Sequence, residues 1–264
     1  MRIDQLLVQR GLASTRSQAQ RLIAAGVRWQ AADAGWRAVQ KNGDDVAVDA
    51  AIELLDSAEA RYVSRGGLKL EAALLHTGLV VEGLSCLDVG QSTGGFTDCL
   101  LRAGAAHVVG VDVGFGQLHE QLRSDPRVTC LERVNARQLS QSDLQGGFSA
   151  MAAAGLEGGH FDLVVGDLSF ISQTLVLPAL LPWLKPLASL LMLVKPQFEL
   201  QPGQVGKGGL VTDRQLFAVV EKRIRAAHAA LGLRVLAYFP SAIHGGDGNH
   251  EFFVHSMRLP EAPQ

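Results

Sequence analysis

The chain has 264 residues, of which 47% are hydrophobic and 19% are charged, so it can bury a large core and is not an intrinsically disordered protein. Lysine and arginine number 24 against 26 aspartate and glutamate residues, so affinity for nucleic acid requires a local basic patch. The three cysteines, Cys86, Cys99 and Cys130, lack CxxC spacing, which argues against both a disulfide framework and a structural zinc site.

The N-terminus is charged and does not show the basic, apolar and cleavage regions of a signal peptide. The most apolar segment, residues 174–194, is interrupted by three prolines and by Lys185, which makes it a poor membrane helix. A helix followed by a buried strand fits this segment better. We therefore expect a cytoplasmic protein that does not enter a membrane.

The N-terminal segment is basic, with seven arginine and lysine residues against two aspartates in the first 41 positions. Its apolar spacing predicts a short helix and then an amphipathic helix over residues 17–26, with Ser14 as the N-cap. Arg16 and Arg21 fall outside the apolar stripe of the second helix, so we expect them to face solvent. On charge alone, a solvated face and a nucleic-acid contact remain equally open.

Three short strands are predicted after these helices, over residues 27–30, 36–39 and 45–48. The N-terminal part of the chain is therefore expected to form a small α+β domain over residues 1–55. Residues 56–65 contain neither glycine nor proline and show little apolar periodicity, so we predict that they form a linker.

The order of these elements and the segment R-I-D-Q-L-L-V-Q-R-G-L-A-S-T-R-S-Q-A-Q-R-L-I-A-A-G-V resemble the S4 RNA-binding domain. The resemblance covers about the first 55 residues and implies contact with structured RNA through the second helix and the following loop. By this resemblance, Arg16, Arg21 and Arg28 lie near phosphates, where each adds salt-sensitive affinity. Arg65 is a further candidate for RNA binding.

From residue 84 onward, strand-sized apolar runs alternate with helical stretches and glycine turns, which predicts an open, mostly parallel sheet with helices on both faces. We therefore expect a Rossmann-like α/β fold with a seven-stranded sheet, whose ligands bind at the carboxyl ends of the strands. The expected strands span residues 86–89, 107–112, 128–131, 161–167, 190–195, 233–239 and 251–255.

A glycine-rich turn follows the first of these strands, with the pattern G-x-x-x-G-G over residues 90–95. It has neither the Gly-Lys-Ser/Thr ending of a P-loop nor the GxGxxG spacing of a dinucleotide site. Asp88 precedes the turn and would repel a pyrophosphate, whereas Asp112 ends the next strand and is placed to accept from ribose hydroxyls. A glycine-rich turn alone fits a dinucleotide site or a plain tight turn equally well, but with both carboxylates it favours S-adenosylmethionine.

Four charged residues stand at the ends of apolar segments: Lys69, Asp167, Lys195 and Glu251. Asp167 and Lys195 are expected at the carboxyl ends of adjacent strands, above the same crevice. For any one of the four, a structural salt bridge is the ordinary interpretation. Four charges of this kind, two of them lysines, favour a catalytic cluster.

The chain as a whole resembles the TlyA-like (hemolysin-A-type) ribosomal RNA 2′-O-methyltransferases, which pair an S4 domain with an FtsJ-like methyltransferase domain, here residues 66–264. The resemblance is carried by S-R-G-G-L-K-L, D-V-G-Q-S-T-G-G-F-T-D-C-L, V-G-V-D-V-G-F-G-Q-L, E-R-V-N-A-R, D-L-S-F-I-S, V-K-P-Q-F-E, G-K-G-G-L-V and G-N-H-E-F. It implies a class I methyltransferase that uses S-adenosylmethionine to methylate the ribose of cytidine in ribosomal RNA or ribosomal subunits.

The resemblance also assigns residues to roles. The Lys-Asp-Lys-Glu catalytic tetrad corresponds to Lys69, Asp167, Lys195 and Glu251. The expected cofactor-binding residues are Asp88, Gly90, Ser92, Gly94, Phe96, Thr97, Asp112, Asn135, Ala136 and Asp167. Three features depart from the family pattern: Gln91 in the glycine turn, Asp247 in a late loop, and a Gly/Ala-rich stretch over residues 145–160 that we expect to be an expanded loop.

Our hypothesis for the reaction makes Lys195 the group that orients or deprotonates the ribose hydroxyl. Lys69 adds a second positive charge and holds phosphate, Asp167 fixes the geometry, and Glu251 positions Lys69. No metal is expected, and the sequence predicts no oligomeric state. Two alternatives from other classes stay open: a pore-forming, hemolysin-like protein, and an RNA-binding module with an inactive methyltransferase fold.

Overall fold

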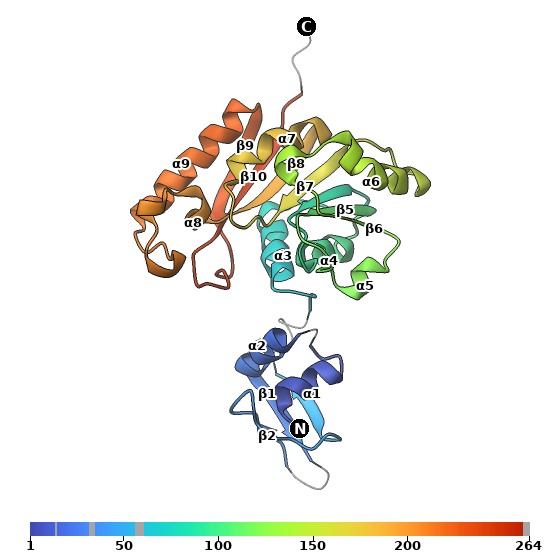
Figure 1. Ribbon diagram of the computed structural model, residues 1–264, viewed down its shortest axis with the longest axis vertical. Coiled ribbons are helices and arrows are strands. Elements are labelled where there is room, and N and C mark those ends of the chain that lie inside the picture. The colour runs from blue at the N-terminus through green and yellow to red at the C-terminus, as the bar shows by residue number, and fades with distance from the viewer. Residues whose placement is uncertain (14, 32–34, 56–60, 261–264) are drawn as a thin grey trace. The chain divides into compact units, whose positions relative to one another are not determined.

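The computed structural model describes residues 1–13, 15–31, 35–55 and 61–260 (Figure 1). The chain divides into two compact units, Met1–Leu68 and Lys69–Gln264. Residues 56–60 of the predicted linker and the predicted N-cap Ser14 lie outside the described residues. Residues 61–68 belong to the first unit, where Tyr62 is buried and its carbonyl accepts a hydrogen bond from Gln18 Nε2 at 3.2 Å.

The first unit packs two helices against a small antiparallel sheet with strand order β2-β1-β3. Its elements are α1 (Ile3–Gln9), α2 (Arg16–Gly26), β1 (Val27–Gln30), β2 (Arg37–Ala38) and β3 (Ala51–Leu54). The side chain of Thr15 accepts from Gln18 N and is the N-cap of α2. The apolar stripes of both helices are buried in one core made by Ile3, Leu6, Leu7, Ala19, Leu22 and Ile23.

The predicted strand over residues 45–48 is wrong. Only an isolated bridge forms there, between Asp45 and Arg2, and the third strand of the sheet is β3. Its alternate residues Ile52 and Leu54 pack against the core, whereas Val48 is 53% exposed. The strand therefore forms where alternation places apolar side chains on the buried face.

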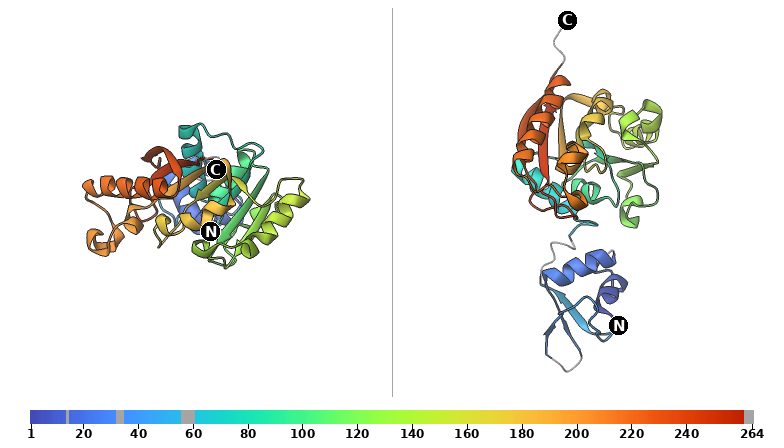
Figure 2. Two further views of the ribbon diagram at one scale, coloured as in Figure 1. Left: turned by 90° about the horizontal axis from the view of Figure 1, so that it is seen from above. Right: turned by 60° about the vertical axis from the view of Figure 1, so that its left-hand side comes forward.

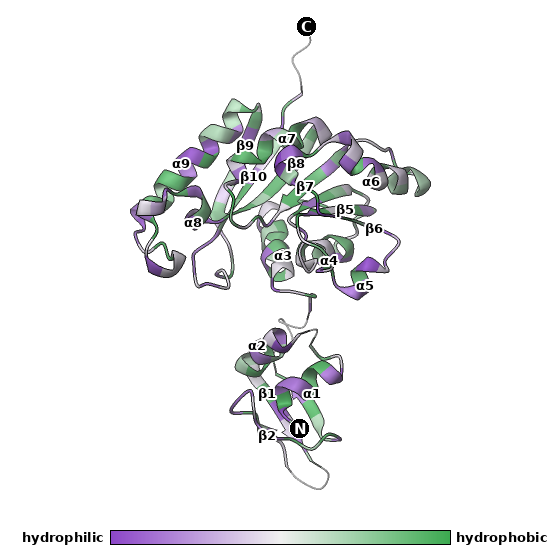
Figure 3. Cartoon of the chain, in the orientation of Figure 1, coloured by the Kyte–Doolittle hydropathy of each residue, from purple (hydrophilic) through white to green (hydrophobic). Residues whose placement is uncertain are grey.

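The second unit is built on a seven-stranded sheet, as predicted, and its strand order is β6-β5-β4-β7-β8-β10-β9. The strands are β4 (Ser85–Val89), β5 (His107–Asp112), β6 (Val128–Glu132), β7 (Phe161–Gly166), β8 (Leu184–Val194), β9 (Leu233–Pro240) and β10 (Phe252–Arg258). The first five strands pair in parallel, and β10 runs antiparallel to both of its neighbours. The strands are predominantly hydrophobic (Figure 3), which fits burial on both faces.

Helices cover both faces of this sheet, as Figures 1 and 2 show. They are α3 (Gly66–Thr77), α4 (Gly95–Arg102), α5 (Glu120–Arg123), α6 (Gln141–Ala153), α7 (Leu177–Leu180), α8 (Pro196–Glu199) and α9 (Gln215–Ala230). The chain leaves β4 toward β5 on one side and returns to β7 on the other. Right-handed crossovers in opposite directions place the connecting helices on opposite faces.

The structure also tests the predictions for the apolar segment over residues 174–194 and for the Gly/Ala-rich stretch over residues 145–160. The apolar segment over residues 174–194 forms short helical turns and then the buried strand β8, which agrees with the helix-then-strand prediction. No helix in the described part of the chain has the length and apolar character needed to cross a bilayer. The expected loop over residues 145–160 is partly wrong, because α6 extends to Ala153 from a capping box of Ser140 and Asp143.

The change of direction between β4 and β7 creates the place where a ligand is expected. Gly90 follows β4 with φ +82°, and a Cβ on it would lie 2.9 Å from the carbonyl oxygen of Asp167, just after β7. Only glycine fits this close approach of the two chain segments. The carboxyl ends of β4 and β7 thus meet at one glycine turn.

Candidate active site

Four charged side chains gather at the carboxyl edge of the sheet as two ion pairs. Lys195 Nζ lies 2.6 Å from Asp167 Oδ1, and Lys69 Nζ lies 2.5 Å from Glu251 Oε2. Asp167 and Lys195 follow the adjacent parallel strands β7 and β8. Glu251 precedes the antiparallel strand β10, whose first residue pairs with the last residue of β8. Sheet register therefore brings together residues that are far apart in the sequence.

The Lys69–Glu251 pair is buried. Glu251 is 4% exposed and Lys69 is 7% exposed. Burial raises the pKa of Glu251, the positive charges of Lys69 and Lys195 lower it, and the negative charge of Asp167 raises it. Since all three charges act on Glu251, the two ion pairs form one electrostatic cluster. Gly245 packs directly against this cluster, because a Cβ at Gly245 would lie 2.7 Å from Glu251 Oε1.

Lys195 is held in a defined direction by two partners on one loop. Its Nζ pairs with Asp167 and also donates a hydrogen bond to Ser169 Oγ at 2.8 Å. An ammonium group has three N–H donors, so one donor remains for a ligand oxygen. The sequence pattern alone does not identify Ser169, although Ser169 lies within the D-L-S-F-I-S motif.

A cavity of about 470 Å³ adjoins this cluster at the carboxyl ends of β4 and β7. This volume is in the usual range for small-molecule sites. Six of the predicted cofactor-binding residues line it: Gly90, Ser92, Asp112, Asn135, Ala136 and Asp167. The cavity and the tetrad therefore share Asp167. No group of three or more histidine, cysteine, aspartate or glutamate residues within the described ranges is arranged to hold a metal ion.

Asp112 is already oriented by the backbone of the glycine turn. Its Oδ2 accepts a hydrogen bond from Ser92 N at 2.7 Å, and its Oδ1 accepts one from Gly114 N at 2.7 Å. Each carboxylate oxygen has a second lone pair, so Asp112 can still accept from two ligand hydroxyls. Ser92 has φ +49°, an uncommon conformation for a residue other than glycine.

The other predicted cofactor residues, Asp88, Gly94, Phe96 and Thr97, do not line the cavity. Gly94 is the N-cap of α4 with φ +94°, and a Cβ there would lie 2.3 Å from the side chain of Leu122. Phe96 is buried and stacks against Phe253 at a ring distance of 6.2 Å. Gly94 and Phe96 therefore take part in the packing around α4.

A buried chain of polar groups lies beneath the turn. Gln91 Nε2 donates to Thr97 Oγ1 at 2.9 Å, and Thr97 Oγ1 donates to Asp88 Oδ2 at 2.7 Å. Asp88 is completely buried, and this burial raises its pKa to about 7. The structure thus explains Gln91, which departs from the family pattern: its amide extends the hydrogen-bond chain that anchors the turn.

We expect Asp88 to make the folded state less stable as the pH rises. Its pKa is 3.8 without perturbation and about 7 in the fold, so between these values the folded chain keeps a proton that the unfolded chain releases. Unfolding by urea at about pH 5 and about pH 8 measures this effect. Asp88→Asn should reduce the loss of unfolding free energy between the two pH values, and equal losses in wild type and variant would contradict the assignment.

The candidate RNA-binding arginines lie in the first unit and take part in its internal contacts. Arg16 pairs with buried Asp4 at 2.9 Å, and Arg28 pairs with Glu53 at 2.7 Å. Both remain substantially exposed, with side-chain exposures of 55% and 40%. Arg21 and Arg65 are partly buried. A guanidinium has five N–H donors, so an ion pair fixes its direction and leaves donors for phosphate.

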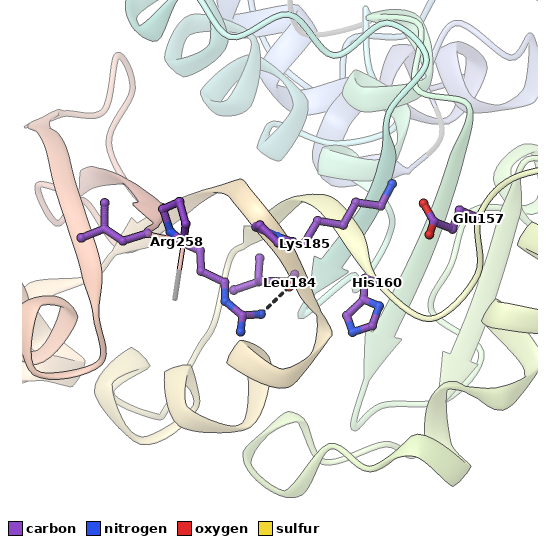
Figure 4. Close-up of a pocket in the computed structure, with 8 residues that line it drawn as sticks. Glu157, His160, Leu184, Lys185 and Arg258 are labelled. Atoms are coloured by element: carbon purple, nitrogen blue, oxygen red, sulfur yellow. Dashed lines mark hydrogen bonds between the residues drawn. The ribbon is translucent and has the colours of Figure 1, made fainter. Parts of the chain in front are cut away.

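A second cavity, of about 650 Å³, lies at the other end of the strands (Figure 4). It is lined where β8 begins, at Leu184 and Lys185, and where β10 ends, at Arg258. Lys185 pairs with Asp162 at 2.8 Å, and Arg258 donates to the carbonyl oxygens of Leu181 and Leu184. Lys185 and Arg258 are therefore engaged in contacts that stabilise the fold. The tetrad lies at the opposite edge of the sheet.

The chain matches two family models: FtsJ-like methyltransferase over residues 62–258 and S4 domain over residues 1–26. It is 45% identical over 254 residues to the 16S/23S rRNA (cytidine-2′-O)-methyltransferase TlyA of Mycobacterium tuberculosis strain H37Rv, covering 96% of this chain and 88% of that protein. These matches bear out the resemblance that the sequence motifs indicated.

Similarity to solved structures supports this family assignment. A putative hemolysin from Streptococcus thermophilus superimposes with a TM-score of 0.73 at 37% identity, covering 100% of this chain and 90% of that one. A putative S-adenosylmethionine dependent methyltransferase from Listeria monocytogenes shares the fold, with a TM-score of 0.51 at 15% identity, covering 74% of this chain and 99% of that one. The Rossmann-like fold prediction is confirmed, and the chain belongs to the TlyA-like group of the FtsJ-like methyltransferase family.

Proposed function

We propose that this enzyme transfers a methyl group from S-adenosylmethionine to the 2′-oxygen of a cytidine ribose in ribosomal RNA. The observation that carries the proposal is the cluster of two lysine–carboxylate pairs at the edge of the cavity. The name of the M. tuberculosis relative, which specifies cytidine 2′-O-methylation of 16S and 23S rRNA, supports the choice of substrate.

The residues of the cavity suit S-adenosylmethionine. Gly90 lines the cavity with backbone alone, and Asp112 has free lone pairs for ribose hydroxyls. Asp88, whose Oδ1 is buried without a hydrogen-bond partner among the described residues, lies beneath the turn and supports the cavity without lining it. The cofactor supplies an activated methyl group on its sulfonium.

The tetrad acts on the nucleophile. A ribose hydroxyl is a poor nucleophile until it is oriented and its proton has a place to go. Lys195 Nζ donates its remaining N–H to the 2′-oxygen and orients it, and the hydroxyl proton passes to the carboxylate of Asp167. Lys69 adds positive charge for the RNA phosphates, and buried Glu251 fixes the position of Lys69.

The S4 domain captures the RNA in this proposal. Its support is the family match over residues 1–26 and the exposed guanidinium groups of Arg16 and Arg28. Arg21 and Arg65 are further proposed contacts. Since phosphate contacts carry counterion release, replacing Arg16 should weaken RNA binding and reduce its salt dependence by about one charge.

Phe170 is a candidate platform for the target base. It lines the cavity, is 90% exposed, and has φ +64°, an uncommon backbone conformation for a bulky residue. Stacking of a base on an aromatic ring is worth about 1–3 kcal/mol, so Phe170→Ala should raise the KM for RNA by about tenfold or more. Steady-state kinetics test this, with Phe170→Tyr as the control that keeps the ring. Equal KM values for the alanine variant and wild type would remove Phe170 from the site.

Labelled methyl transfer to purified ribosomal subunits tests the proposed function. Full-length protein should transfer label from S-adenosylmethionine to the RNA, and isothermal titration should detect binding of the cofactor alone. Cofactor binding without transfer to either subunit or to free ribosomal RNA would contradict the proposal. Absence of both cofactor binding and transfer would favour the inactive-fold alternative.

A further inference from the structure

Glu199 is a buried carboxylate that the proposed reaction does not use. It ends α8, the single helical turn that begins directly after Lys195. Glu199 is only 3% exposed, and burial raises its pKa, while hydrogen bonds from Ser172 and Gln173 lower it. Burying a carboxylate is costly unless hydrogen bonds compensate, so its partners identify what it holds.

Both partners lie at the end of the loop that follows β7. Ser172 Oγ donates to Glu199 Oε2 at 2.5 Å, and Gln173 N donates to Glu199 Oε1 at 2.9 Å. We call these three residues, Ser172, Gln173 and Glu199, the Glu199 cluster. From the other side, Arg223 of α9 donates to the carbonyl oxygen of Glu199. The carboxylate thus links the loop to a fixed segment of the fold.

The same two segments meet at three successive points. Lys195 contacts Asp167 and Ser169 at the start of the loop. The rings of Phe170 and Phe198 lie 5.2 Å apart in the middle. The Glu199 cluster forms the third contact, at the end of the loop near Ser172 and Gln173.

The loop between the end contacts holds a conformation that needs support. Phe170 has a left-handed backbone, which is strained for a bulky residue and persists only when its surroundings fix it. The preceding residue, Ser169, is fixed by Lys195, and Ser172, two residues later, is fixed by Glu199. Loss of the second contact would let the loop relax and shift Asp167 and Ser169 relative to Lys195.

We infer that Glu199 is a positioning residue, which holds the loop over residues 167–173 so that Asp167 and Ser169 orient Lys195. The inference rests on the proposed function for the reaction but concerns a residue that does not touch the substrate. A displacement of about 1 Å at a reacting group can cost about 100-fold in rate. Breaking the Glu199 cluster should therefore lower kcat by about tenfold or more. Since residues 167–171 also line the cavity, the KM for S-adenosylmethionine should rise as well.

The test compares Ser172→Ala and Glu199→Gln with Ser256→Ala in the full-length protein. Ser256 is a matched control, because it is also a buried serine with a side-chain hydrogen bond, to His228 Nδ1 at 2.9 Å, away from the tetrad. Ser172→Ala and Glu199→Gln should lower kcat, while Ser256→Ala should lower the unfolding temperature and leave kcat unchanged. Hydrogen exchange should be faster in the peptide containing Gln173 N for the first two variants only.

Two further comparisons separate a positioning role from a structural one. In a Ser169→Ala background, Ser172→Ala should cause a smaller additional loss of kcat than in wild type, because both changes act on Lys195. The inference would be overturned if kcat were unchanged in both Glu199-cluster variants, or if their loss of kcat were no larger than that of Ser256→Ala. An effect confined to the KM for S-adenosylmethionine would also overturn it. Wild type is assayed in parallel, so an inactive wild type would reject the proposed function instead.

Discussion

Replacing Lys195 by methionine is expected to lower the rate of methyl transfer by about 10²- to 10⁴-fold, the usual contribution of a positioned acid–base group. The side chain keeps its apolar part but loses the amine that contacts Asp167 and Ser169. Cofactor affinity should change little, since Lys195 does not line the cavity. Single-turnover kinetics and isothermal titration measure the two quantities separately.

Lys185→Met is the matched control for this experiment. Lys185 also forms an ion pair with an aspartate, Asp162, on the same two strands, but at the opposite edge of the sheet. It should retain the wild-type rate. If Lys195→Met keeps full methylation with normal cofactor binding, Lys195 does not have the role assigned to it.

The second large expected effect is a loss of stability when the buried Lys69–Glu251 ion pair is broken. Lys69→Met or Glu251→Gln alone removes one partner and leaves the other charge buried, which should lower the free energy of unfolding by about 3–5 kcal/mol. The double variant leaves no unpaired charge, so it should recover most of this free energy. Chemical denaturation of the three variants measures the difference.

Activity should not return with stability in the double variant. In the proposed mechanism, Lys69 supplies positive charge to the RNA, and methionine cannot replace that charge. Methyl transfer by the double variant should therefore stay at the level of Lys69→Met. Recovery of both stability and activity would show that the pair is purely structural.

Much of the site could be predicted because its residues interrupt local patterns. Lys195 and Asp167 are charges at the ends of apolar strands, and Gly90 and Asp112 stand at strand ends in an alternating α/β pattern. Parallel strands place their carboxyl ends at one edge, so strand assignment alone brings these residues together. Lys69 and Glu251 are assigned by the family resemblance, and the register of β10 against β8 explains why Glu251 lies beside Lys195.

The unpredicted features depend on tertiary contacts. Gln91 and Glu199 are polar residues in short segments, and only the fold shows that Gln91 joins Thr97 and that Glu199 joins Ser172. The misassigned strand near residue 45 has the same cause. Residues 45–48 and β3 both alternate, and pairing with β1 selects β3.

The central claim is that the tetrad directs the methyl group to a sugar oxygen. Mass spectrometry of nucleosides from ribosomal RNA methylated by the purified protein tests it directly. The account predicts 2′-O-methylcytidine in the wild-type reaction, resistant to alkaline cleavage on its 3′ side, and its loss with Lys195→Met. A methyl group on a base, in RNA that alkali cleaves normally, would contradict the account.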